Sequence, residues 1–137
     1  MKVRREKVWD KYNHHCAYCG NDLEYKDMQV DHFIPQRLAW WFKTDVYISK
    51  YNLPRDINHI NNLMPSCRRC NHYKRSELPE NFRETMKTIH DRIAQIYICK
   101  VAKDYNIIEF HPWDGLFYFE KHNKMRRTKT IFKENKK

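Results

Sequence analysis

Residues 16–20 read CAYCG and residues 67–71 read CRRCN, two Cys-x-x-Cys pairs with 47 residues between them. Thiols paired at this spacing are typical of a structural zinc site, in which four thiolates hold one ion. The alternative is two unrelated redox or surface motifs. Closing so long a loop costs roughly 3–4 kcal/mol, whereas structural zinc supplies on the order of 10–16 kcal/mol. The pattern therefore predicts Zn²⁺ bound by Cys16, Cys19, Cys67 and Cys70, which pins both ends of residues 20–66.

Between the two pairs lies the segment MQVDHFIPQ, residues 28–36, in which Asp31 and His32 interrupt an apolar, β-prone run. A charged side chain is costly to bury unless a partner compensates it. We therefore expect the pair to have such a partner or to take part in chemistry. On the dipeptide alone, Asp31 could cap a turn and His32 could be an ordinary core histidine. In a regular strand neighbouring side chains point to opposite faces, so both reach one site only where the backbone bends.

The motifs from residue 16 to residue 74 occur in the order C-x-x-C-G, V-D-H-x-I-P, N-L and C-x-x-C-N-x-x-K. Each piece is common by chance, but the combination closely resembles the HNH endonuclease family over a little under half of the chain. The resemblance implies an α+β fold with a small zinc-stabilised ββα-metal core, and hydrolysis of DNA phosphodiester bonds. The stretch between His32 and Asn62 is longer than the compact family pattern and has no Gly-Gly turn, so we expect an insert there.

The same resemblance implies roles for individual residues. His32 would be the general base that takes a proton from the attacking water, and Asn62 would brace the loop that orients it. Asp31 and Asn71 would bind a catalytic divalent ion, with the histidine after Asn71 as an alternative ligand, and Lys74 would hold its helix near the phosphate. General chemistry agrees, because histidine titrates near neutral pH and carboxylate and amide oxygens favour Mg²⁺ or Mn²⁺.

The chain divides into three expected parts. Residues 1–78 would form the nuclease core, including an aromatic-rich insert at 37–58 with a helix of its own. The WWF cluster at 40–42 in this insert either stacks on bases or fills a small core. Residues 79–120 would pack on the core, and residues 121–137 would form a basic tail.

The part that follows the core has the clearest helical periodicity. Apolar residues recur every three or four positions from Pro79 to Tyr105, which predicts one long amphipathic helix. Cys99 lies among apolar neighbours in this helix and is expected to be a small core residue. Residues 107–110 and 116–119 are strand-like and predict a C-terminal β-hairpin.

The net charge of +10 is concentrated at the end of the chain. Residues 121–137 contain eight Lys or Arg and one acid, and the remainder has a net charge of only +3. Such an excess indicates a nucleic-acid partner, or a solvated tail that binds nothing. With the nuclease resemblance it predicts duplex DNA as the partner. The residues expected to contact backbone phosphates are Arg68, Arg69, Lys74, Arg75, Lys124, Arg126 and Arg127.

Two other classes of function fit the composition. One is a non-catalytic zinc-knuckle module that binds nucleic acid, and the other is a subunit of a nucleoprotein assembly. Neither class needs Asp31, His32 and Asn71. No stretch resembles a base-reading helix, so we expect either a weak sequence preference of the chain alone or specificity supplied by partner proteins. The chain has no apolar run near the ~20 residues of a membrane helix and no signal-peptide pattern at its start, which predicts a cytoplasmic protein without a membrane partner.

Overall fold

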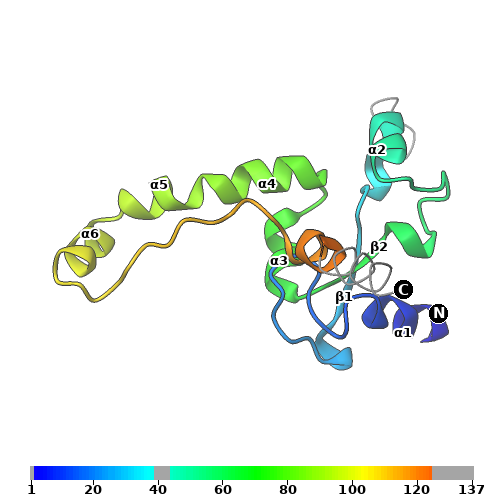
Figure 1. Cartoon of the computed structure of the whole chain (residues 1–137), viewed down its shortest axis with the longest axis horizontal. Coiled ribbons are helices and arrows are strands. Elements are labelled where there is room, and N and C mark those ends of the chain that lie inside the picture. The colour runs from blue at the N-terminus through cyan, green and yellow to red at the C-terminus, as the bar shows by residue number, and fades with distance from the viewer. Residues whose placement is uncertain (1, 39–43, 125–137) are drawn as a thin grey trace, which may run out of the picture.

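The computed structural model describes residues 2–38 and 44–124, and it places a two-stranded sheet at the centre of an α+β core. Figure 1 shows helices around this sheet and an arm that extends from it. The elements of the core are α1 (Lys2–Asp10), η1 (Tyr25–Asp27), β1 (Gln29–His32), η2 (Gln36–Leu38), α2 (Thr44–Lys50), η3 (Ile60–Asn62), β2 (Leu63–Ser66) and α3 (Arg68–Lys74). The two strands and the helix that follows them have the order that the sequence predicts.

The strands β1 and β2 pair antiparallel in an unbroken register from Gln29↔Ser66 to His32↔Leu63. The predicted bend between Asp31 and His32 is therefore not formed within the ladder, and their side chains leave opposite faces of β1. The last residue before α3 is Cys67, whose Sγ accepts a hydrogen bond from the backbone N–H of Cys70. Cys67, the first cysteine of the second Cys-x-x-Cys pair, thus serves as the N-cap of α3, and α3 packs against β1. Each Cys-x-x-Cys pair is called a knuckle below.

The main hydrophobic core is aromatic, and it joins the first knuckle to the segments that follow residue 79. Tyr18, Phe33, Phe82, Phe117 and Phe119 are all buried and belong to one cluster. The rings of Phe82 and Phe117 are stacked with centroids 5.0 Å apart, and Tyr18 meets Phe117 edge to face at 5.5 Å. Aromatic pairs of this kind contribute about 0.5–1.5 kcal/mol beyond their buried area. The segment after residue 79 is therefore part of the fold that positions the knuckle.

The prediction of one long helix from Pro79 is wrong. The chain forms α4 (Pro79–Lys87), α5 (Ile89–Ala94) and α6 (Tyr97–Asp104) instead. Near the first break the hydroxyl of Thr88 donates to the carbonyl of Thr85, a local bond that competes with helix propagation. At the second break Ile96 is extended, with φ −80° and ψ 124°. These helices form the arm in Figure 1, and the chain returns along them to the core.

The predicted C-terminal β-hairpin is also wrong. Residues 108–114 have no regular secondary structure, and residues 118–124 are helical. The backbone N–H groups of Tyr118 and Phe119 donate to the carbonyls of Tyr18 and Ala17. This segment therefore pairs with the first knuckle rather than with residues 107–110.

Some predictions concern parts of the chain outside the described residues. These are the WWF cluster at 40–42 and the tail from residue 125, which includes Arg126 and Arg127. The insert does contain a helix, α2, as predicted. Among residues 2–38 and 44–124, no helix has both the length and the apolar character needed to cross a membrane.

Candidate functional site

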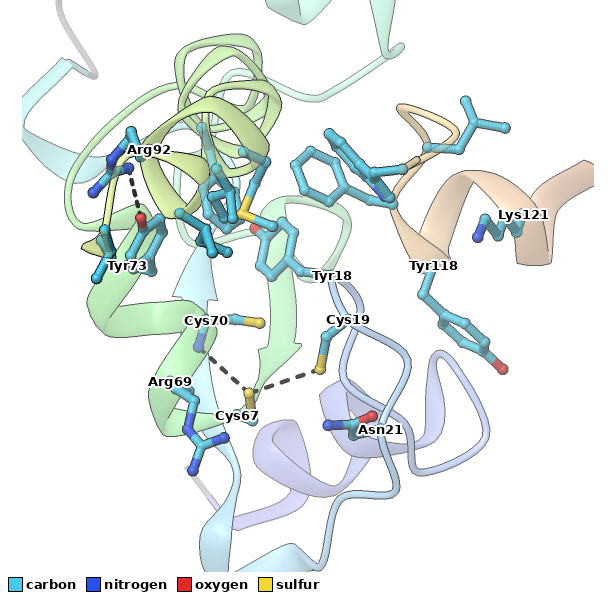
Figure 2. Close-up of a pocket in the computed structure, with 18 residues that line it drawn as sticks. Tyr18, Cys19, Asn21, Cys67, Arg69, Cys70, Tyr73, Arg92, Tyr118 and Lys121 are labelled. Carbon is cyan, nitrogen blue, oxygen red and sulfur yellow. Dashed lines mark hydrogen bonds between the residues drawn. The ribbon is translucent and has the colours of Figure 1, made fainter. Parts of the chain in front are cut away.

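The four knuckle cysteines come together although two of them precede the sheet and two follow it. Their Sγ atoms all lie within 4.8 Å of one another, and those of Cys19 and Cys67 are 3.9 Å apart. Zinc–sulfur bonds of about 2.3 Å in a tetrahedron require sulfur–sulfur distances of about 3.8 Å. The cluster therefore matches the size of a four-thiolate zinc site, and Figure 2 shows Cys19, Cys67 and Cys70 gathered at one point.

The thiols in this cluster shift one another's acidity. The pKa of Cys16 is lowered because the thiols of Cys19 and Cys70 donate hydrogen bonds to it. The pKa of Cys19 is raised to about 11 by its bond to Cys16, and that of Cys70 is also raised, first by its bond to Cys16. Four sulfurs so close together cannot all be thiolates without a cation among them. A bound divalent metal ion removes this conflict.

The backbone around the first pair depends on Gly20. Its φ of +79° lies in the left-handed region, and a Cβ built there would come within 2.7 Å of the ring of Tyr118. Glycine adopts this conformation without steric cost. Across the cluster, the backbone N–H of Cys67 donates to Sγ of Cys16 at 3.4 Å. The left-handed backbone at Gly20 and the hydrogen bond between the two cysteine pairs thus both hold the sulfur atoms in place.

Asp31 is buried on the face of β1 that α3 covers, and two groups compensate it. Its Oδ2 lies 3.0 Å from Nζ of Lys74 and accepts a hydrogen bond of 2.5 Å from the hydroxyl of Tyr18. The side chain of Lys74 is 0% exposed, and its ammonium also donates to the carbonyl of His32. Burial, followed by the neighbouring Asp31, raises the pKa of Tyr18 well above its ordinary value. The compensation that the sequence demanded therefore comes from a lysine and a tyrosine.

Lys74 and Asp31 form a buried ion pair. Burial lowers the pKa of Lys74, while the neighbouring Asp31 acts in the opposite direction. Buried pairs of this kind often contribute little to stability, and apolar replacements are often neutral or stabilising. A buried, charge-paired group with a perturbed pKa is a candidate for a functional site.

Asn71 lies beside this pair on α3. Its Nδ2 donates to Oε1 of Gln29 at 2.5 Å, and Gln29 shares a face of β1 with Asp31 because it is two residues away. Asn71 and Lys74, three residues apart, likewise share a side of α3. Asp31 and Asn71 thus lie at one β1–α3 contact and offer the hard oxygen donors that Mg²⁺ or Mn²⁺ takes. These two oxygen donors are of the chemical type that Mg²⁺ or Mn²⁺ binds. Such an ion would have to replace Lys74 as the positive charge beside Asp31.

His32 is separate from this contact. It is half-buried, it ends β1, and its Nε2 lies 3.0 Å from Oδ1 of Asn58. This contact orients the imidazole and engages one of its two ring nitrogens. The predicted convergence of Asp31 and His32 on one face does not occur, because the strand between them is regular.

Asn62 is buried and joins the segments on both sides of the insert. Its Oδ1 accepts from the backbone N–H of Ile34 at 2.8 Å, and its Nδ2 donates to the carbonyls of Ile34 and Ile57. Its own carbonyl accepts from the N–H of Phe33, directly after His32. These bonds fix the backbone at the end of β1, directly after His32.

The basic residues near the site differ in exposure. Arg68, Arg69 and Arg75 around α3 are exposed, as is Lys124. Lys74 is different: its buried ammonium is bound to Asp31, so the prediction that it contacts phosphate does not fit this structure. The reason is that Lys74 lies on the side of α3 that packs against β1.

An open groove of about 810 Å³ lies beside the cysteine cluster. Figure 2 shows it between the arm and the knuckle, with Tyr18, Tyr73 and Tyr118 on its walls. Its apolar lining includes Phe82, Met86, Ile89, Ile93, Trp113 and Phe117. Asp31, His32, Asn62 and Asn71 are not among its lining residues, so this groove is distinct from the candidate catalytic residues.

Three partners of the site were not predicted from the sequence: Tyr18, Gln29 and Asn58. Tyr18 lies between the two cysteines of the first pair, where a large aromatic residue is a usable signal. Gln29 precedes Asp31 by two residues, which is the spacing of one strand face. Asn58 lies in the insert, and nothing in its local sequence indicates that it reaches His32.

Comparisons with protein-family models, with curated proteins and with solved structures found no match to this chain.

Proposed function

We propose that this chain is a metal-dependent endonuclease of the HNH type, which hydrolyses phosphodiester bonds in DNA. The observation that carries the proposal is the buried Asp31 carboxylate, paired with Lys74 at the β1–α3 contact where Asn71 also lies. The four-cysteine cluster and the bracing bonds of Asn62 support it, since both match the motif order of the family.

In this proposal His32 takes the proton from the attacking water. Its half-buried ring and its contact with Asn58 support this role, because the contact orients the imidazole and engages only one of its two ring nitrogens. His32 is the terminal residue of β1 and Asp31 precedes it on the other face. The scissile phosphate must therefore lie across this end of the strand rather than over one face.

Asp31 and Asn71 would hold the catalytic Mg²⁺ or Mn²⁺. Such an ion, when bound, stabilises the charge that develops on the phosphoryl and leaving oxygens. Without it, Lys74 neutralises Asp31 and keeps the carboxylate in place. Arg68, Arg69 and Arg75 would contact the DNA backbone, and their exposure supports this.

The test is nicking of supercoiled plasmid by the zinc-loaded protein with Mg²⁺ or Mn²⁺. His32→Ala should lower the rate by roughly 100-fold or more, since a general base contributes about 10²–10⁴. His111→Ala is the matched control, because the side chain of His111 is 77% exposed and lies 3.8 Å from Glu109 on the surface. Zinc content, measured by mass spectrometry, should be one ion per chain in all three proteins. Equal nicking by the parent and His32→Ala would contradict the proposal.

The second candidate is a non-catalytic module that binds nucleic acid through its zinc knuckle and basic residues. The observation that favours it is the regular β1 ladder, which separates Asp31 from His32. Salt-dependent DNA binding by the parent, with no nicking under any divalent ion, would select this function. In that case His32→Ala should bind DNA as the parent does.

A further inference from the structure

Tyr18 is held by its neighbours in the sequence, by its backbone and by its ring. It lies between Cys16 and Cys19, and Figure 2 shows its ring beside the cysteine cluster. Its backbone carbonyl accepts a hydrogen bond from the N–H of Tyr118 at 3.0 Å. Tyr18 is only 3% exposed, and its ring meets that of Phe82 edge to face with centroids 5.5 Å apart. The hydroxyl of a ring that is packed in this way can orient the group that it binds.

The group that Tyr18 binds is one oxygen of the Asp31 carboxylate. Its hydroxyl donates to Oδ2 at 2.5 Å. Nζ of Lys74 lies 3.0 Å from the same oxygen. Both groups therefore approach Oδ2, and Oδ1 is left as the oxygen of Asp31 for a ligand.

The two contacts of Oδ2 differ in their response to a cation. The ammonium of Lys74 is positively charged, so a divalent ion at the same carboxylate would repel it. The hydroxyl of Tyr18 is neutral, and it can keep its hydrogen bond to Oδ2 while Oδ1 takes an ion. Tyr18 is therefore the contact that is compatible with both the ion-free and the ion-bound carboxylate.

We propose that Tyr18 is a positioning residue for the divalent ion, because it holds the Asp31 carboxylate in the orientation that presents Oδ1. This inference rests on the proposed function, in which Asp31 and Asn71 bind that ion. Carboxylate ligands of metal ions are themselves held by hydrogen bonds, and loss of such a partner typically lowers the metal affinity by roughly 10–100-fold. The first knuckle thus has a second role, since the residue between its two cysteines orients a ligand of another metal ion.

The test is the affinity of the full-length, zinc-loaded protein for Mn²⁺ without DNA, measured from the electron paramagnetic resonance signal of the free ion. Tyr18→Phe removes the hydroxyl but keeps the ring, and it should raise the Mn²⁺ dissociation constant by roughly 10–100-fold. Tyr73→Phe is the matched control and should leave this constant unchanged, because the hydroxyl of Tyr73 is bound to Arg92 instead. Asn71→Ala should also weaken binding, which identifies the ion as the one at the β1–α3 contact.

Two further measurements separate positioning from a purely structural role. Tyr18→Phe should retain the parent's far-ultraviolet circular dichroism spectrum, because the ring and its packing are kept. Excess Mn²⁺ should restore plasmid nicking by Tyr18→Phe to nearly the parent's rate, because mass action offsets a weaker affinity. A damaged fold would not be restored in this way.

Four outcomes would overturn the proposal. They are equal Mn²⁺ affinities of the parent and Tyr18→Phe, a parent that binds no Mn²⁺, an Asn71→Ala variant that binds as tightly as the parent, and a Tyr18→Phe variant that loses the parent's spectrum. Failure of the proposed function has a different result. A parent that binds Mn²⁺ and shows the expected effect of Tyr18→Phe, but nicks no plasmid, would contradict the nuclease and support the role of Tyr18.

Discussion

Replacing Lys74 with methionine should strongly destabilise the protein, and replacing its partner as well should restore much of the loss. Lys74→Met leaves the Asp31 carboxylate buried without its cation, although the hydroxyl of Tyr18 still donates a hydrogen bond to it. Removing one member of a buried ion pair costs about 3–5 kcal/mol, because the remaining charge is uncompensated. The free energy of unfolding should fall by that amount.

The double variant Asp31→Asn/Lys74→Met removes both charges. The asparagine keeps an oxygen that accepts the hydrogen bond from Tyr18, so no buried hydroxyl loses its partner. Replacing a buried ion pair by uncharged groups is often close to neutral. We therefore expect the double variant to lose only about 1–2 kcal/mol, less than Lys74→Met alone. With the single variant Asp31→Asn measured as well, the departure from additivity gives the coupling energy between the two sites.

The assay is urea unfolding at pH 7, followed by tryptophan fluorescence and circular dichroism. Free zinc is held constant for all variants, because zinc binds the folded state and adds to its stability by mass action. Lys87→Met is the matched control, since Lys87 is 51% exposed and pairs with Glu84 on the surface of α4. It should change the free energy of unfolding by less than about 0.5 kcal/mol.

Two outcomes would refute this reasoning. A loss below about 1 kcal/mol in Lys74→Met would mean that Asp31 is not left as a buried charge. A double variant whose loss equals the sum of the single losses would mean that the two side chains do not interact. In either case Lys74 would not be the group that compensates the buried Asp31 carboxylate.

Three further predictions concern the zinc cluster and the interior. Removing zinc with a chelator should abolish cooperative thermal unfolding. The reason is that a structural zinc site supplies on the order of 10–16 kcal/mol, whereas a domain has a total stability of only about 5–15 kcal/mol. An unchanged melting curve would show that the cluster is not a zinc site. Asn62→Ala should cost roughly 2–4 kcal/mol in urea unfolding, since it leaves buried groups of Ile34 and Ile57 without partners, while the exposed neighbour Asn61→Ala should change little. Burial lowers the pKa of Lys11 from 10.5 to about 8, so between these pH values the unfolded state binds a proton that the folded state does not. The free energy of unfolding should therefore rise with pH by about 1.4 kcal/mol per pH unit in this range. Lys11→Met should lack this rise, and an equal slope in both proteins would contradict a lowered pKa of Lys11.

Features set by short-range chemistry could be predicted from the sequence. The spacing of the cysteines predicted the cluster, because two Cys-x-x-Cys pairs and one ion have few other arrangements. The strand at 29–32 and the helix after Cys67 followed from local propensity and from the knuckle that caps the helix. The bracing bonds of Asn62 agree with the role that the motif order implies. Nuclease activity, the catalytic ion and DNA binding stay predictions.

Features that depend on which distant segment covers a surface could not be predicted. Helical periodicity after Pro79 shows that an apolar face exists, but it does not say what packs on that face. The chain breaks the helix after residues 87 and 94, and α6 has no buried residue. It likewise bound residues 118 and 119 to the first knuckle in place of a hairpin.

The buried charge of Asp31 shows most clearly what the sequence determined and what only the tertiary structure decided. The sequence by itself required that a carboxylate in an apolar strand have a compensating partner, because an isolated buried charge is too costly. Only the fold decided that the partners are Lys74, 43 residues away, and Tyr18 from the first knuckle. Desolvation is a property of the residue and can be judged locally, whereas the groups that offset it are brought there by the packing of α3 and the knuckle on β1.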